Sequence, residues 1–221
     1  MSKDNRSIEY RKTGTIELRD GEQPVLAGVA APYYDGTEGT QYELWPGVSE
    51  RYAPGCFDES LKQDDIRALF NHDPSNVLGR NRSGTLRLTS TSRGLEYEID
   101  VDDTQVGRDV HKMAKRGDID GSSCGWYAVK ESWSRSGNHE IRTIEKAQLF
   151  DVSPVTYPAY AATTAQARGD DGDLSAPRQS YERWKAEEQA VADAASRERD
   201  AAAAAVQLAK IRGVDEFESI S

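Results

Sequence analysis

Hydrophobic and polar positions alternate along much of the first 167 residues, and this alternation predicts a strand-rich domain. The pattern is clearest in residues 84–91 and 94–101, where residues two apart share a face, as a half-buried strand requires. Gly, Pro, Asn and Asp residues separate these runs and mark turns. Further strands are predicted over residues 15–19, 24–34 and 139–157.

Two segments depart from alternation and predict helices. A short helix is expected after Pro54 and Gly55. A second is expected between Thr104, a candidate N-cap, and Gly117, a candidate stop, because apolar residues recur there at helical spacing: Val106, Val110, Met113 and Ala114. The fold class predicted is therefore α+β, with a barrel-like sheet flanked by a few helices.

The composition changes after residue 167. Residues 168–177 form a polar linker rich in Gly and Asp, and residues 178–221 form an acidic, Ala-rich segment without Pro, which predicts a helical tail. Large apolar residues are sparse in the tail, so the pattern permits a solvated helix and equally a weak coiled coil that supports self-association. The sequence therefore predicts three parts: a domain over residues 1–167, a linker over 168–177 and a tail over 178–221.

Charge and cysteine content exclude several classes of function. The 221 residues hold 28 Lys and Arg against 38 Asp and Glu, a net charge of −10, which disfavours nucleic acid as a partner. Two cysteines, Cys56 and Cys124, make neither a disulfide framework nor a zinc site, so no metal or cofactor is expected. The chain shows no signal-like apolar segment and no stretch long enough to span a bilayer, so no membrane association is expected.

Three histidines are the candidates for a general base that works near neutral pH. His72 lies where an apolar run meets a turn rich in Asn, Asp and Pro, so a rigid strand end can hold it. His111 lies among basic residues of the second predicted helix and His139 follows a turn, so both are expected to be exposed. Taken alone, His72 also fits a purely structural turn.

Two further segments carry candidate partners for His72. Small residues surround Ser123 in Gly121–Gly125, which lets a substrate backbone approach a nucleophile and leaves amide groups for an oxyanion; a simple turn fits equally. Asp151 interrupts an apolar, β-branched strand, where a carboxylate needs a partner. An imidazole would be such a partner, and so would a neighbouring turn or an Arg.

The motifs of this chain, taken in their order along the sequence, resemble those of the prohead proteases of tailed bacteriophages. The resemblance covers roughly residues 8–167 and rests on an ordered set: Gly28-Val29-Ala30, Glu50 with Pro54-Gly55-Cys56-Phe57, Asn71-His72-Asp73, Gly94-Leu95, Ser123-Cys124-Gly125-Trp126, and residues 149–159. It implies a fold similar to the herpesvirus assemblins and a serine endopeptidase inside the immature capsid, in the host cytoplasm. It also implies capsid and scaffold proteins as substrates, and cleavage of the enzyme by itself.

The resemblance implies His72, Ser123 and Asp151 as the catalytic residues, with Asp151 where relatives often carry Glu. A cysteine protease that uses Cys124 is an alternative, since a thiolate paired with His72 performs the same acyl transfer. Adjacent residues of a strand point to opposite faces, so Ser123 and Cys124 cannot both address His72. A non-enzymatic capsid assembly or scaffold protein is the second alternative.

Overall fold

The computed structural model describes residues 8–19, 21, 23–101, 103–156 and 174–218, and the side chains of 12–15 and 209–218 are outside this description. The chain divides into two compact units, Met1–Ala176 and Pro177–Ser221. The predicted linker and the end of the last sequence motif fall largely on residues 157–173, outside the described residues.

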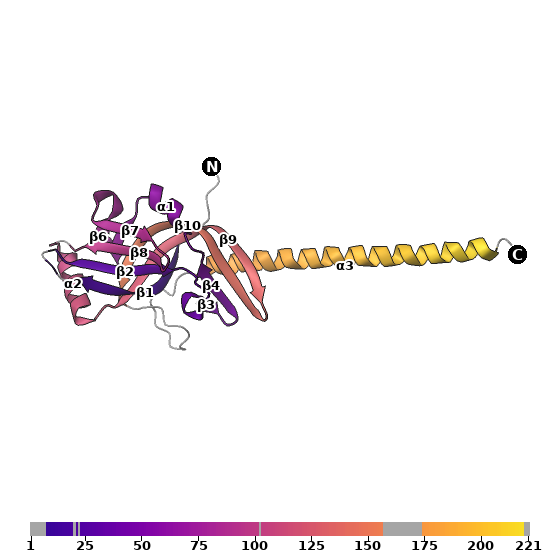
Figure 1. Ribbon diagram of the computed structural model, residues 1–221, viewed down its shortest axis with the longest axis horizontal. Coiled ribbons are helices and arrows are strands. Elements are labelled where there is room, and N and C mark those ends of the chain that lie inside the picture. Colours follow the sequence, from indigo (N-terminus) through magenta and orange to yellow (C-terminus); the bar gives the residue numbers. More distant parts are fainter. Residues whose placement is uncertain (1–7, 20, 22, 102, 157–173, 219–221) are drawn as a thin grey trace. The chain divides into compact units, whose positions relative to one another are not determined.

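Ten strands of the described part of unit 1 form one sheet with the order β3-β4-β10-β9-β1-β2-β8-β7, and β5 pairs with β10 and β6 (Figure 1). The pattern of alternation predicted β7 and β8 well, and β10 begins at the expected residue. The strands are β1 Glu9–Arg19, β2 Val25–Pro32, β3 Tyr42–Trp45, β4 Val48–Tyr52, β5 Arg67–Phe70, β6 Asp73–Arg80, β7 Leu86–Ser90, β8 Gly94–Asp100, β9 Gly121–Ser136 and β10 His139–Val155.

Strands β9 and β10 are the centre of the sheet. They pair antiparallel along their whole length through a turn at Gly137, whose φ is 61°. The first half of β9 also pairs with β1, while β10 pairs in parallel with β4 and, further along, with β5. Because β10 has both short strands along one edge, segments far apart in the sequence meet beside it.

Two helices pack on unit 1, as expected. Helix α1, Asp58–Gln63, ends just before β5. Helix α2, Gln105–Arg116, begins where the Thr104 side chain accepts a hydrogen bond from Gly107 N, and it ends at Gly117 with φ 76°, a left-handed residue typical of helix ends. Short 3-10 turns cover η1 Glu38–Thr40 and η2 Asn81–Ser83.

The hydrophobic core is built mainly from buried side chains of the strands, and it explains the alternating pattern. Apolar residues of β2, β8 and β10 contribute one face each, and Val110 inserts from α2. Its large buried members include Leu26, Tyr33, Tyr52, Phe57, Leu95, Tyr97, Ile99, Trp126, Ile144 and Leu149. Unit 1 is thus strand-rich and of the α+β class, with helices α1 and α2 packed against its strands.

An isolated bridge joins two strands that are not neighbours in the sheet order. Tyr33, just after β2, bridges Tyr52 at the end of β4, and Tyr34 N donates a hydrogen bond of 2.8 Å to Tyr52 O. The bridge links β2 to β4, which lies on the other side of β10, β9 and β1 in the strand order.

Helix α3, Ser175–Glu218, accounts for the described residues of the second unit, and it agrees with the helical tail that the composition predicts. It begins three residues earlier than predicted, within the expected linker. The Tyr181 and Trp184 rings lie 6.0 Å apart near its start, and Val191, Val206 and Leu208 are exposed along it. No helix among the described residues is both long and apolar enough to span a membrane.

Candidate active site

A two-residue hairpin turn between β5 and β6 carries His72. Asn71 and His72 both have positive φ, 54° and 57°, and Phe70 pairs with Asp73 across the turn. Two-residue hairpins favour turns with positive φ at both central positions, because their twist matches that of the strands. Asn adopts this conformation readily, whereas His does so less often, so the turn holds His72 in a conformation that its surroundings must maintain.

The end of β10 supplies those surroundings. Asn71 N donates to Pro154 O at 3.1 Å, and Thr156 N donates to Asn71 Oδ1 at 2.9 Å. His72 N donates to Ser153 Oγ at 3.3 Å. These bonds fix the hairpin tip on β10, so the direction of the imidazole is set by long-range contacts as well as by the local turn.

Ser123 and Asp151 lie on one face of the central hairpin. In the register of β9 and β10, Ser123 is opposite Ser153 and Gly125 is opposite Asp151. Side chains alternate between faces along a strand, so positions 123 and 125 share a face, and positions 151 and 153 share it too. The same face therefore receives the imidazole of His72.

The three residues predicted from the sequence form a continuous hydrogen-bonded chain. His72 Nε2 lies 2.6 Å from Ser123 Oγ, and His72 Nδ1 lies 2.6 Å from Asp151 Oδ1. With the proton on Nδ1, the imidazole donates to the carboxylate and accepts from the Ser123 hydroxyl at Nε2. This arrangement can activate a serine hydroxyl for attack on a carbonyl.

Burial differs among the three residues. Ser123 is fully buried and Asp151 is 5% exposed, whereas the His72 side chain keeps 13% of its surface exposed. Ser153, also fully buried, donates to Asp151 Oδ1 at 2.8 Å. The carboxylate thus has two hydrogen-bond donors in a site that is largely shielded from water, which offsets the cost of its burial.

Two residues of the site, Tyr10 and Ser153, were not singled out in the sequence. The Tyr10 ring packs on the His72 ring with centroids 4.4 Å apart, and Tyr10 is opposite Gly125 in the pairing of β1 with β9. A Cβ at position 125 would lie 2.8 Å from Tyr10 Cε1 and would also collide with Asp151 Oδ2. Gly125 is therefore the residue that gives both side chains room beside His72.

Signals for these residues are weak in the sequence. Ser153 lies within the closing motif, two residues after Asp151, so period-two alternation alone would have placed it on the same face. Tyr10 depends on the pairing of β1 with β9, which joins residues more than 100 positions apart. Local patterns do not reveal such a pairing.

Cys124 lies on the opposite face of β9. It is fully buried in the hydrophobic core, and burial raises the pKa of its thiol far above the ordinary value. A thiolate is the reactive form of cysteine, and burial in apolar surroundings makes it inaccessible. The Cys124 side chain therefore faces away from His72.

The other two histidines lie elsewhere, and both are partly buried, not exposed as expected. His139 lies at the start of β10, where its Nε2 is 2.7 Å from Ser49 Oγ of β4. His111 lies on α2. The expectation of exposure was wrong: both residues are partly buried, and His139 contacts Ser49 of β4. Neither histidine is hydrogen-bonded to Ser123 or Asp151 among the described contacts.

A cluster of buried charges lies on the core side of β1, beneath the site. Arg11 Nε donates to Glu50 Oε1 at 2.6 Å, and Arg142 Nη1 donates to Glu50 Oε2 at 2.6 Å. Both guanidinium groups also bond Glu9, at 2.9 Å from Arg11 and 2.6 Å from Arg142. Burial acts to raise the pKa of the Glu50 carboxyl, but Arg11 and Arg142 outweigh it and lower this pKa.

This cluster explains the acidic residue of the second sequence motif. Glu50 joins β4 to β1 and β10 through Arg11 and Arg142. Arg11 follows Tyr10 directly, so the bonds that fix Arg11 on the core side also fix Tyr10 on the side of His72. Buried ion pairs of this kind persist only when every charge is paired, as it is here.

Within the described residues, no group of three or more His, Cys, Asp and Glu side chains has the arrangement of a metal site. The candidate site consists entirely of groups that act by proton transfer and nucleophilic attack.

Two comparisons with known proteins give matches. The family model of the caudovirus prohead serine proteases matches residues 15–175, well over half of the chain. The solved structure of the bacteriophage T4 capsid assembly protease is similar at 12% identity, over 70% of this chain and 100% of that chain, with a TM-score of 0.48. None of the curated proteins compared matches. The family match is what assigns the chain: it belongs to the caudovirus prohead serine proteases.

Proposed function

We propose that this serine peptidase of capsid maturation cleaves peptide bonds with His72 as general base, Ser123 as nucleophile and Asp151 as the residue that orients the imidazole. Family membership gives the class of reaction, hydrolysis of peptide bonds by a serine enzyme. The observation that supports the assignment of residues is the pair of 2.6 Å contacts from the two ring nitrogens of His72.

The mechanism follows from these contacts. Ser123 Oγ attacks the carbonyl carbon of the scissile bond while its proton passes to His72 Nε2. Asp151 accepts a hydrogen bond from His72 Nδ1–H during the whole reaction and stabilises the imidazolium that forms. The imidazolium then protonates the leaving amine, and a water molecule, deprotonated by the same imidazole, hydrolyses the acyl-enzyme and restores Ser123.

A cysteine enzyme is the weaker proposal for this chain. Cys124 is buried on the core face of β9 with a raised thiol pKa, whereas Ser123 is within hydrogen-bonding distance of the imidazole. A purely structural protein is also disfavoured, because family membership implies hydrolase activity.

The proposed substrates are capsid and scaffold proteins within the assembling prohead, in the cytoplasm of the infected host. This proposal rests on the family, whose description places its members in the prohead. Self-association through the tail is part of the same proposal, supported by the exposed Val191, Val206 and Leu208 of α3.

We also infer that the sheet is barrel-like. The bridge between Tyr33 and Tyr52 supports this inference, because it connects β2 to β4 and so completes a circuit through β10, β9 and β1. A closed circuit buries the inward side chains of all five strands and leaves fewer unpaired edges.

Labelling with diisopropyl fluorophosphate tests the assignment of the nucleophile. We expect one adduct per chain, on the peptide that contains Ser123, in a preparation that cleaves its substrate. His72→Ala should suppress the adduct, since an unactivated serine hydroxyl is a weak nucleophile. Intact and peptide mass spectrometry measure it; an adduct on a different residue, or none in an active preparation, contradicts the assignment.

We further propose that the enzyme cuts itself within residues 168–177. The segment is polar and rich in Gly and Asp, features that favour exposed, cleavable chain, and the tail beyond it forms a compact unit of its own. Wild-type protein should therefore yield a species that ends in this segment, while Ser123→Ala should remain intact. Equal truncation of both proteins by intact mass would assign the cut to another protease.

A further inference from the structure

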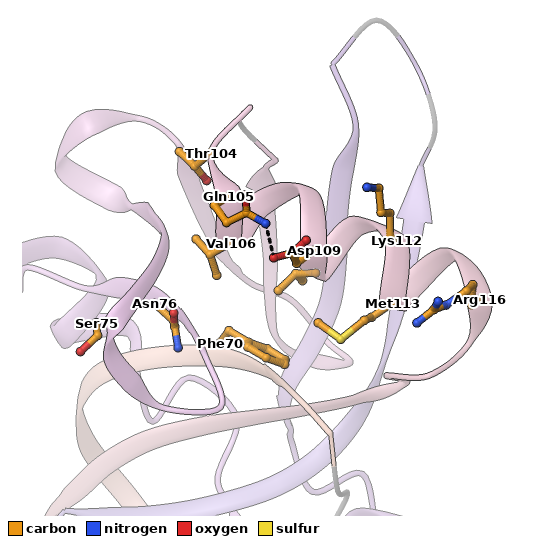
Figure 2. Close-up of a pocket in the computed structure, with 11 residues that line it drawn as sticks. Phe70, Ser75, Asn76, Thr104, Gln105, Val106, Asp109, Lys112, Met113 and Arg116 are labelled. Carbon is orange, nitrogen blue, oxygen red and sulfur yellow. Dashed lines mark hydrogen bonds between the residues drawn. The ribbon is translucent and has the colours of Figure 1, made fainter.

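A pocket of about 780 Å³ lies between helix α2 and the hairpin that carries His72 (Figure 2). Phe70 of β5 forms one wall, and Val106, Val110 and Met113 of α2 form the opposite wall. Pockets of this volume commonly bind ligands the size of several amino-acid side chains. The space is large enough for one large side chain and part of its flanking backbone.

Both walls continue directly into the catalytic elements. Phe70 is two residues before His72 in the same hairpin, and Ser75 and Asn76 of the pocket follow it in β6. On the other side, α2 ends at Arg116, and a short connection, held by the bond from Ile16 N to Asp120 O, leads to Gly121 of β9. Ser123 is two residues further along β9.

This connectivity places the pocket within reach of a bound substrate. An extended chain advances about 3.3 Å per residue, so a pocket wall two residues from His72 is reached by a substrate residue within about three positions of the scissile bond. The pocket and His72 thus share the β5–β6 hairpin.

The lining is apolar at its centre and polar at its rim. Phe70, Val106 and Met113 pack against the core but remain partly exposed toward the pocket, whereas Val110 is fully buried beneath them. Figure 2 shows Gln105 and Asp109 along the upper rim, joined by a hydrogen bond of 2.6 Å. The rim charges Asp109, Lys112 and Arg116 include both signs and do not select a single charge.

We propose that this pocket binds a large apolar side chain of the substrate polypeptide, within about three residues of the scissile bond, and so sets the cleavage specificity. The inference rests on the proposed function and adds the class of substrate residue. Partly exposed apolar walls lose contact with water when such a side chain enters, and a charged side chain would lose its hydration at the apolar centre. The substrate is expected to carry Leu, Ile, Met or Phe at this position.

Two substitutions change the pocket in opposite directions. Val106→Trp fills it from α2, and Met113→Ala enlarges it. Val129→Trp is the control, because Val129 is 53% exposed on β9 and does not line the pocket. Ser123→Ala measures the background cleavage by contaminating proteases.

The measurement is the cleavage profile of each full-length protein on a library of proteome-derived peptides, read by mass spectrometry. Wild type and Val129→Trp should share a preference for a large apolar residue at one position. Val106→Trp should lower kcat/KM for those peptides by about 10- to 100-fold relative to peptides with a small residue there, the range typical of a changed hydrophobic pocket. Met113→Ala should favour the largest side chains.

The possible results of this experiment distinguish a failure of the pocket assignment from a failure of the proposed function. An unchanged profile in both pocket variants, from enzymes that still cleave, overturns the pocket assignment. If Val106→Trp fails to fold by circular dichroism, the profile of Met113→Ala still decides. Wild-type cleavage that persists in Ser123→Ala contradicts the proposed function itself.

Discussion

Ser123→Ala is expected to lower the rate of substrate cleavage by about 10⁴ to 10⁶, the usual cost of removing a catalytic nucleophile. The hydroxyl bonds His72 Nε2 at 2.6 Å, and its loss leaves no atom at this position to form the acyl-enzyme. The side chain is small, so the substitution removes little packing and the fold should persist. Single-turnover cleavage of the cognate capsid protein measures the rate, and circular dichroism checks the fold.

His72→Ala should be as damaging, and the double variant should be no worse than either single one. Nucleophile and base act as one unit, so their losses are not additive. His111→Ala and His139→Ala serve as controls and should cleave at nearly the wild-type rate. A double variant whose loss equals the product of the single losses would show that the two residues act independently.

Asp151→Asn is expected to lower activity by about 10⁴, because an amide facing Nδ1 favours the wrong imidazole tautomer. Asp151 Oδ1 lies 2.6 Å from Nδ1 and also accepts the Ser153 hydroxyl at 2.8 Å, so the carboxylate is the acceptor that both donors require. The substituted side chain has nearly the same shape, and the fold should be retained. Cleavage rates and thermal unfolding of the two proteins test this.

Retention of full activity in Asp151→Asn would make this carboxylate structural. Ser153→Ala separates the two roles further: it removes one donor to the carboxylate but leaves the bond to His72, so its loss should be much smaller than that of Asp151→Asn.

The sequence predicted much of the fold because the relevant signals were local. Alternation located β7 and β8, and helix α2 has the start at Thr104 and the stop at Gly117 that its residues indicated. The sequence motifs also contain the three candidate site residues, and the structure brings Ser123 and Asp151 within hydrogen-bonding distance of His72.

What could not be predicted depends on long-range pairing. The buried charges Glu9, Arg11 and Arg142 occupy strand positions that resemble exposed ones, and they become internal only when β1, β4 and β10 assemble. The contact of Tyr10 with His72 depends likewise on the pairing of β1 with β9. No local pattern specifies either set of neighbours.

The central claim is that Ser123, activated by His72, cleaves the capsid protein. Its most direct test is the intact mass of the cognate major capsid protein after co-expression with wild type, Ser123→Ala or Cys124→Ala. We predict a shortened capsid protein with wild type and Cys124→Ala, and a full-length one with Ser123→Ala. A shortened capsid protein with Ser123→Ala, together with a full-length one with Cys124→Ala, would contradict the account.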